Sequence, residues 1–263
     1  MSDPIIQVPK FRVFAILGLS LSILFRNIVP FGLIALFIMS PTYIYLYVSD
    51  PNPVLDDGFN SAAGITDIID IILSYFVTAI LVFGVFQSLR GQPVSIIESV
   101  TRGLWVILPV IGVVVIRGLI WAAFGGLMLG AMFAASGPAA IIVAVIVVIL
   151  AIYVTCILWV IVPAAAVEGR VLSSFGRSIH LTKGNRWRVF GLLLMAGIIS
   201  ALVGMLAGFI GGAIGSYSSV ILLTWAATAI TTAFGAVVVT VAYYRLCLVK
   251  DGIDENQIAA VFD

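Results

Sequence analysis

Six apolar runs, each long enough to cross a lipid bilayer, dominate this sequence. A membrane-spanning helix needs about 20 mostly apolar residues, and such runs are found at 28–49, 64–89, 105–133, 139–166, 189–214 and 219–248. Apolar residues make up 62% of the chain and charged residues 10%, whereas soluble domains have roughly 45–50% and about 25%. The sequence therefore predicts an all-α polytopic membrane protein, folded as one six-span domain over residues 1–263. With a net charge of +1, nucleic acid is excluded as a partner.

The basic residues fall on alternate segments between these runs. The segment 50–60 contains aspartates and no Lys or Arg, and the turns 134–138 and 215–218 carry no charge. Every basic residue except Arg117 lies in the remaining segments or, as Arg245 does, within the last four residues of the sixth run. Because positive residues near span ends stay in the cytoplasm, we expect both termini on that side of the membrane.

The runs pair into three hairpins, each preceded by a shorter stretch. Residues 11–26 are too short for a span and carry a narrow small and polar stripe, which indicates a retained helix lying on the inner leaflet. The segments 91–100, 169–178 and 252–261 each begin with Gly after the end of an even-numbered span, and they align by eye. They suggest one short amphipathic cytoplasmic helix plus one hairpin, repeated near 11–90, 91–168 and 169–251, with a short tail helix at 252–263. A chance similarity between apolar sequences is the alternative.

Two of the runs carry small residues at every fourth position. The glycines of these stripes are Gly118, Gly126 and Gly130 in the third run and Gly204, Gly208 and Gly212 in the fifth. Small residues at this spacing let helix backbones approach closely in lipid. The stripes therefore predict helix–helix packing seams, either within this chain or with another protomer in a homo-oligomer.

Arg117 is the one basic residue that this charge pattern does not place on the cytoplasmic side. It lies on the order of 18 Å from the start of the third run, at 1.5 Å per residue, and a lone Arg at that depth costs at least about 2.5 kcal/mol. We expect an ion pair with Asp70, or with Asp67 as the substitute. A structural pair is the simpler interpretation, and an ion or proton pathway is the alternative.

Residues that could carry catalysis are scarce. The chain has one histidine, His180, and no His or Cys cluster with metal-ligand spacing. It also lacks a phosphate-binding glycine loop. We therefore expect no catalytic residues, no metal, no cofactor and no enzyme activity.

The densest polar signal is the basic segment 168–188. Lys183, Asn185, Arg186, Trp187 and Arg188 precede the fifth run, where the free N–H groups of a helix start favour anions. Each basic residue near an anionic leaflet contributes about 1 kcal/mol. The segment thus predicts a site for a phospholipid head group, and a simple topology signal with an aromatic anchor is the alternative. Glu168 is expected to pair with Arg177 or Arg170.

The same segment carries a resemblance to a known family. Pro163–Glu168, Arg177–Ser178 and Leu181–Gly191, together with Tyr243–Leu246 and Lys250–Gly252, are similar to the signature of the glycerophosphoryl diester phosphodiesterase membrane domain family. The resemblance implies a six-span fold in a bacterial inner membrane. The phosphodiesterase domain fused in some members needs histidine and acidic metal ligands that this chain lacks, so no enzyme activity is implied.

Two functions stay open on the sequence alone. The first is a structural or interaction module that contacts anionic phospholipids or a partner membrane protein. It predicts a packed bundle with a lipid head group near residues 183–188. The second is a small transporter or permease-like subunit, which predicts a water-filled pocket that reaches Arg117 and Asp70.

Overall fold

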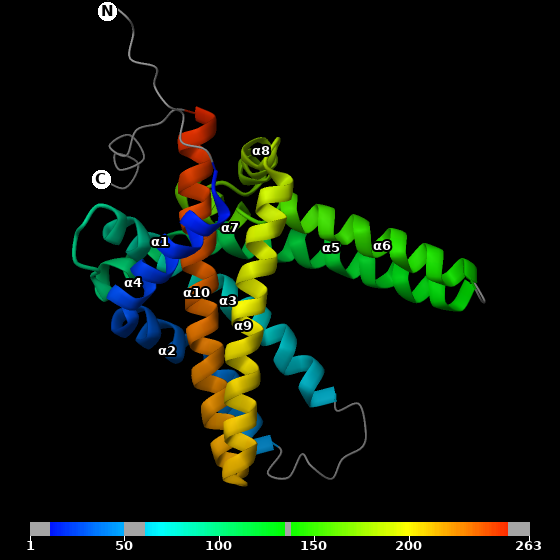
Figure 1. The fold of residues 1–263 in the computed structure, drawn as a ribbon, viewed down its shortest axis with the longest axis horizontal. Coiled ribbons are helices and arrows are strands. Elements are labelled where there is room, and N and C mark those ends of the chain that lie inside the picture. The colour runs from blue at the N-terminus through cyan, green and yellow to red at the C-terminus, as the bar shows by residue number, and fades with distance from the viewer. Residues whose placement is uncertain (1–10, 50–60, 135–137, 252–263) are drawn as a thin grey trace, which may run out of the picture.

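The computed structural model describes residues 11–49, 61–134 and 138–251, and these segments form helices joined by short turns (Figure 1). The long helices are α2 (Ile28–Ser49), α3 (Ser61–Leu89), α5 (Ile107–Ala134), α6 (Pro138–Ile157), α9 (Arg186–Ile214) and α10 (Tyr217–Asp251). The short helices are α1 (Val13–Arg26), α4 (Ile96–Trp105), α7 (Ile161–Glu168) and α8 (Val171–Thr182).

Six segments are long and apolar enough to cross a membrane. They confirm the predicted all-α polytopic fold. The fourth predicted run differs in one respect, because the chain breaks between α6 and α7 at residues 158–160. Pro163 lies in the first turn of α7, where its missing N–H is tolerated, whereas a continuous helix would place its ring against the carbonyl of residue 159.

The three hairpins diverge from one end of the molecule (Figure 1). The α9–α10 hairpin is long and closely paired, while the α5–α6 hairpin projects away from it. The end from which they diverge, where α10 finishes and the short helices gather, is here called the basic end. Its basic residues are Arg12, Arg26, Arg90, Arg102, Arg170, Arg177, Lys183, Arg186, Arg188, Arg245 and Lys250. The opposite ends of the long helices, where the hairpins turn, are called the turn ends.

Helix α10 is the centre of the packing. Its residues Val237, Val238 and Val241 are fully buried, and it contacts α1, α2, α3 and α9. In the most apolar 18-residue stretch of α3, 44% is buried inside the protein. In the corresponding stretch of α5, 11% is buried. The α5–α6 hairpin therefore presents most of its side chains to its surroundings, and the tight six-helix bundle expected for an interaction module is not formed.

The short helices pack in a recurring way. Helix α4 packs against α3, α8 against α7, and α1 against α10, so each contacts the last helix of another predicted unit. Gly91 and Gly169, which precede α4 and α8, both have a left-handed φ, of 71° and 66°. Such values favour glycine because it has no Cβ. This arrangement supports the internal repeat, which stays a prediction, and its tail helix at 252–263 lies outside the described residues.

The prediction that these glycine stripes pack against other helices of this chain is wrong. A Cβ built at each of these glycines has no neighbouring atom within 4 Å: Gly118, Gly126, Gly130, Gly204, Gly208 and Gly212. The physical reason is the divergence of the hairpins, which leaves these stripes of α5 and α9 without a partner helix. A seam with a second protomer stays a prediction.

Close helix approaches occur instead at other glycines. A Cβ at Gly103 of α4 would lie 2.8 Å from Ile80 Cα of α3, and a Cβ at Gly211 of α9 would lie 2.8 Å from Val220 Cα of α10. At these two crossings the backbone of one helix therefore packs directly against a glycine of the other. The small residues at every fourth position did not predict these contacts.

Candidate functional site

The basic segment folds into a tight corner between α8 and α9. Gly184 has a φ of 85°. Asn185 precedes α9, and its side chain accepts no hydrogen bond from the N–H groups at the start of that helix. The Asn185 amide is used otherwise, because its Oδ1 accepts a hydrogen bond from Arg188 Nη1 at 3.1 Å. The first N–H groups of a helix have no acceptor within the helix, so those of Arg186 and Trp187 are open to an external anion.

Arg186 extends from this corner to α6. Its guanidinium carbon lies 4.8 Å from the centroid of the Tyr153 ring, and its Nη1 donates a hydrogen bond to the Tyr153 hydroxyl. Its buried Nε has no hydrogen-bond partner among the described residues. Arg186 is therefore held in place by Tyr153 while it keeps an unused donor.

Further cations border the corner. Lys183 is exposed beside it, and a Cβ at Gly184 would lie 3.8 Å from Lys250 Nζ of α10. Trp187 is 85% exposed, in the position of an aromatic side chain at a membrane interface. The predicted anion-binding residues thus share one corner, with the difference that Arg188 turns towards Asn185.

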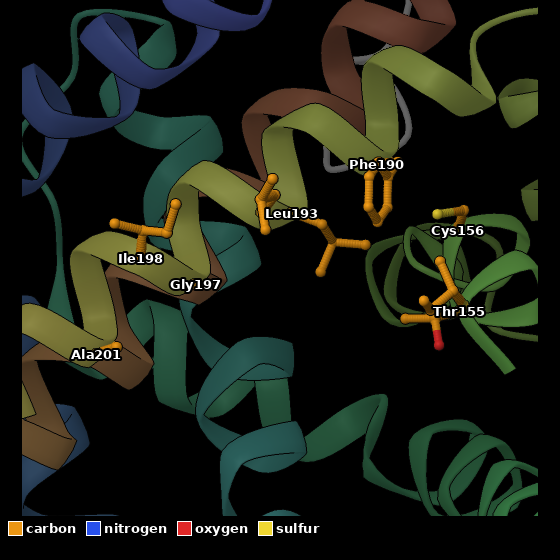
Figure 2. Close-up of a pocket in the computed structure, with 9 residues that line it drawn as sticks. Thr155, Cys156, Phe190, Leu193, Gly197, Ile198 and Ala201 are labelled. Atoms are coloured by element: carbon orange, nitrogen blue, oxygen red, sulfur yellow. The ribbon is translucent and has the colours of Figure 1, made fainter. Parts of the chain in front are cut away.

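An apolar groove leads from this corner between α6 and α9. Its part next to the corner has a volume of about 600 Å³ and is lined by Ile149, Ile152, Tyr153, Cys156, Gly184, Arg186, Trp187 and Phe190. It continues into a second part of about 420 Å³, which is lined by Ile152, Thr155, Cys156, Phe190, Leu193, Leu194, Gly197, Ile198 and Ala201. Figure 2 shows Phe190 of α9 and Cys156 of α6 on opposite sides of this second part.

The length of the groove is comparable to one leaflet. The wall of α9 from Phe190 to Ala201 is about 17 Å long at 1.5 Å per residue, and half of a bilayer core is about 15 Å. Sequence reasoning found the cations on α9 but missed the α6 wall. Tyr153 was the one aromatic signal on this wall, because its hydroxyl lies near the end of a helix that is aliphatic up to that point.

Arg177 connects three helices next to the corner. Its Nε lies 3.4 Å from Glu168 Oε1 of α7, and its Nη2 lies 2.5 Å from Asp251 Oδ2 of α10. The expected Glu168–Arg177 pair is thus present, and Asp251 is a partner that sequence reasoning missed. Burial alone would lower the pKa of Arg177, but the neighbouring Cys247, Tyr243 and Asp251 raise it above its ordinary value.

The predicted pair between Arg117 and Asp70 is wrong. The guanidinium carbon of Arg117 lies 5.4 Å from the ring centroid of Tyr75, and no described carboxylate is within ion-pair distance of it. Asp70 lies beside Thr42 of α2 instead, and Asp67 is exposed. The reason is that α5 meets α3 on the face that carries Tyr75, whereas Asp70 points towards α2.

No metal centre is found in the part of the chain that the structure describes, since no three His, Cys, Asp or Glu side chains come together there. Comparisons with family models, with curated proteins and with solved structures give no match. The resemblance to the glycerophosphoryl diester phosphodiesterase membrane domain family therefore stays a prediction.

Proposed function

We propose that this membrane protein binds an anionic phospholipid of the cytoplasmic leaflet in the groove between α6 and α9. The observation that carries the proposal is the continuity of the groove with the corner: an apolar slot opens directly onto Arg186 and the start of α9. In this proposal the basic end faces the cytoplasm, as expected for positive residues near span ends, and the membrane is the bacterial inner membrane that the resemblance implies.

The corner has the donors that a phosphate group needs. The Arg186 guanidinium has five N–H donors, of which one on Nη1 is bonded to Tyr153, and guanidinium groups bind phosphate oxygens with paired donors. The N–H groups at the start of α9 add a favourable site for an anion. Lys183 and Lys250 raise the local positive potential, so an anionic head group is favoured over a zwitterionic one.

The slot has the shape and polarity of an acyl-chain site. Its α9 wall includes Gly197, which has no side chain, and Ala201, whose side chain is a single methyl group, and both leave room beside the helix (Figure 2). A Cβ at Gly197 would meet no atom within 4 Å. One acyl chain of a lipid whose phosphate lies at Arg186 would therefore extend along Phe190 towards Ala201.

The alternative function as a small transporter has lost its main support. It relied on Arg117 and Asp70 forming one polar site, and these residues face different helices. Contact with a partner membrane protein is compatible with the exposed α5–α6 hairpin, but the groove combines an apolar slot with cations.

We expect Gly197→Leu to remove most of the phospholipid that co-purifies with the protein, because the added side chain fills the slot. Gly204→Leu is the matched control on the same helix, since its side chain would also enter open space but lies outside the groove. Native mass spectrometry after purification in mild detergent and addition of phosphatidylglycerol measures the bound lipid. Equal occupancy in the two variants would refute the proposed site.

Arg186→Gln tests the head-group end of the same site. Hydrogen bonds to charged groups contribute about 1.5–3 kcal/mol, so we expect at least about a tenfold lower affinity for phosphatidylglycerol. Phosphatidylcholine has the same phosphate, but its choline cation offsets the negative charge, so we expect it to bind the wild type more weakly and to lose less affinity on the substitution. A similar decrease in affinity for both lipids would show that Arg186 does not distinguish head groups by their net charge.

A further inference from the structure

A second pocket lies at the basic end, between α3 and α4. It has a volume of about 250 Å³ and is lined by Phe83, Phe86, Gln87, Arg90, Gln92, Glu98 and Arg102. Figure 1 shows α4 on the other side of α10 from the α5–α6 hairpin, so this pocket is separate from the groove. Pockets that hold drug-sized ligands have roughly 300–1,000 Å³, which indicates a smaller ligand here, of the size of a lipid head group.

Hydrogen bonds hold the polar wall of this pocket in place. Gln87 Oε1 of α3 accepts a hydrogen bond from Ser95 N at 3.0 Å, and Gln87 Nε2 donates one to Glu98 Oε2 of α4 at 2.7 Å. The other carboxylate oxygen of Glu98 lies 3.1 Å from Arg102 Nη2. Arg90, in the turn after α3, adds a second guanidinium group to the lining. The pocket therefore presents charges of both signs on a preformed wall.

The balance of these charges favours a zwitterion over a simple anion. Guanidinium groups bind a phosphate with paired donors, so a bound anion would draw Arg102 away from Glu98. The Glu98 carboxylate would then lose its cation. A ligand that carries an ammonium group next to its phosphate replaces this cation. With such a ligand, both the carboxylate and the guanidinium groups have partners of opposite charge.

The pocket lies at the level where lipid head groups are found. Phe83 and Phe86 of its lining are buried and belong to the last turns of the apolar span Thr66–Leu89, and Arg90 follows that span directly. On α4, Ile97 and Trp105 are 81% and 83% exposed, and their spacing of eight residues places them on one face of the helix. A lipid of the adjacent leaflet can therefore place its head group in the pocket and its acyl chains against this apolar face.

We propose that this pocket binds a phosphoethanolamine group, with the phosphate on Arg90 and Arg102 and the ammonium on Glu98. The head group of phosphatidylethanolamine and free phosphoethanolamine share this chemistry, and the exposed apolar face of α4 favours the lipid. The described lining of the α6–α9 groove contains no carboxylate, so the two sites select different head groups. The proposal does not rest on lipid binding in the groove.

Native mass spectrometry of the full-length protein with added lipids tests this site, in a Gly197→Leu background so that the groove does not contribute. We expect phosphatidylethanolamine to bind more tightly than phosphatidylcholine, whose trimethylated amine cannot donate a hydrogen bond to Glu98. Glu98→Gln retains an acceptor for Gln87 and should weaken phosphatidylethanolamine binding about fivefold, the upper end for an exposed ion pair, without weakening phosphatidylglycerol binding. Arg90→Gln should weaken the binding of both lipids. Arg26→Gln replaces an exposed arginine of α1 and is the matched control, which should change neither.

Soluble phosphoethanolamine forms the second arm of the experiment. If it binds without lipid as tightly as phosphatidylethanolamine does, the chemistry of the site is supported and its source is the free compound. Equal phosphatidylethanolamine binding in Glu98→Gln, Arg90→Gln and Arg26→Gln would overturn the proposal. Tighter binding of phosphatidylglycerol than of phosphatidylethanolamine at an unaltered pocket would also overturn it, because the site would then select a simple anion. Both results are obtained with the groove blocked, so they are distinct from a failure of the groove proposal.

Discussion

Arg177→Gln is expected to lower the free energy of unfolding by about 2–3 kcal/mol, because it removes the link between α7, α8 and α10. Loss of one partner of a buried ion pair leaves the other charge uncompensated and costs about 3–5 kcal/mol. The expected value lies lower here because the side chains of Arg177 and Asp251 remain 24% and 16% exposed. Thermal and denaturant unfolding in detergent, followed by tryptophan fluorescence, measures the change.

Arg170→Gln is the matched control for this prediction. Arg170 precedes the same helix, is exposed and makes no ion pair in the described structure, so its substitution should change stability by less than about 0.5 kcal/mol. In the double variant Arg177→Gln with Asp251→Asn, the second substitution should cost little, because interacting partners are not additive. Equal destabilisation by the Arg177 and Arg170 substitutions would contradict the proposed link.

Gly211→Leu should be among the most destabilising substitutions in the long helices. Its Cβ would lie 2.8 Å from Val220 Cα and 3.3 Å from Val220 N, and both are backbone atoms that cannot turn aside. The start of α10 must therefore separate from α9, which also strains the hydrogen bond that Ser219 Oγ donates to Gly211 O at 3.0 Å. Overpacking costs typically about 1–3 kcal/mol, and we expect the upper part of that range.

Gly208→Leu supplies the comparison on the same helix. No atom lies within 4 Å of a Cβ at this position, and leucine is the better helix former by several tenths of a kcal/mol. We expect unchanged or slightly higher stability in the same unfolding assay. If Gly208→Leu is as harmful as Gly211→Leu, the glycine stripe is packed against another protomer, and the sequence-based seam would be present between chains.

The glycines show why part of this fold could be predicted and part could not. The long apolar runs define spans because a helix in lipid must satisfy its own backbone hydrogen bonds, which is a local requirement. Whether a glycine faces another helix depends on how the hairpins are oriented. Gly204 and Gly211 look alike in sequence, yet only Gly211 meets a neighbouring backbone.

The candidate site, like the fold, could be predicted from the sequence only in part. The cations at Lys183 and Arg186 could be predicted because they are contiguous and precede an apolar run. Tyr153 of α6 and Asp251 of α10 could not, since their contacts with Arg186 and Arg177 bring together distant parts of the chain. The Arg117–Asp70 prediction failed because residues at similar depths can point to different neighbours.

The divergence of the α5–α6 hairpin has a consequence for the surrounding bilayer. Helix α5 has 28 residues, about 42 Å at 1.5 Å per residue, whereas the hydrocarbon core is about 30 Å thick. A strongly inclined α5 can therefore span the core without hydrophobic mismatch. A protein whose outer helices are inclined occupies more area in one leaflet than in the other. Its free energy therefore depends on membrane curvature.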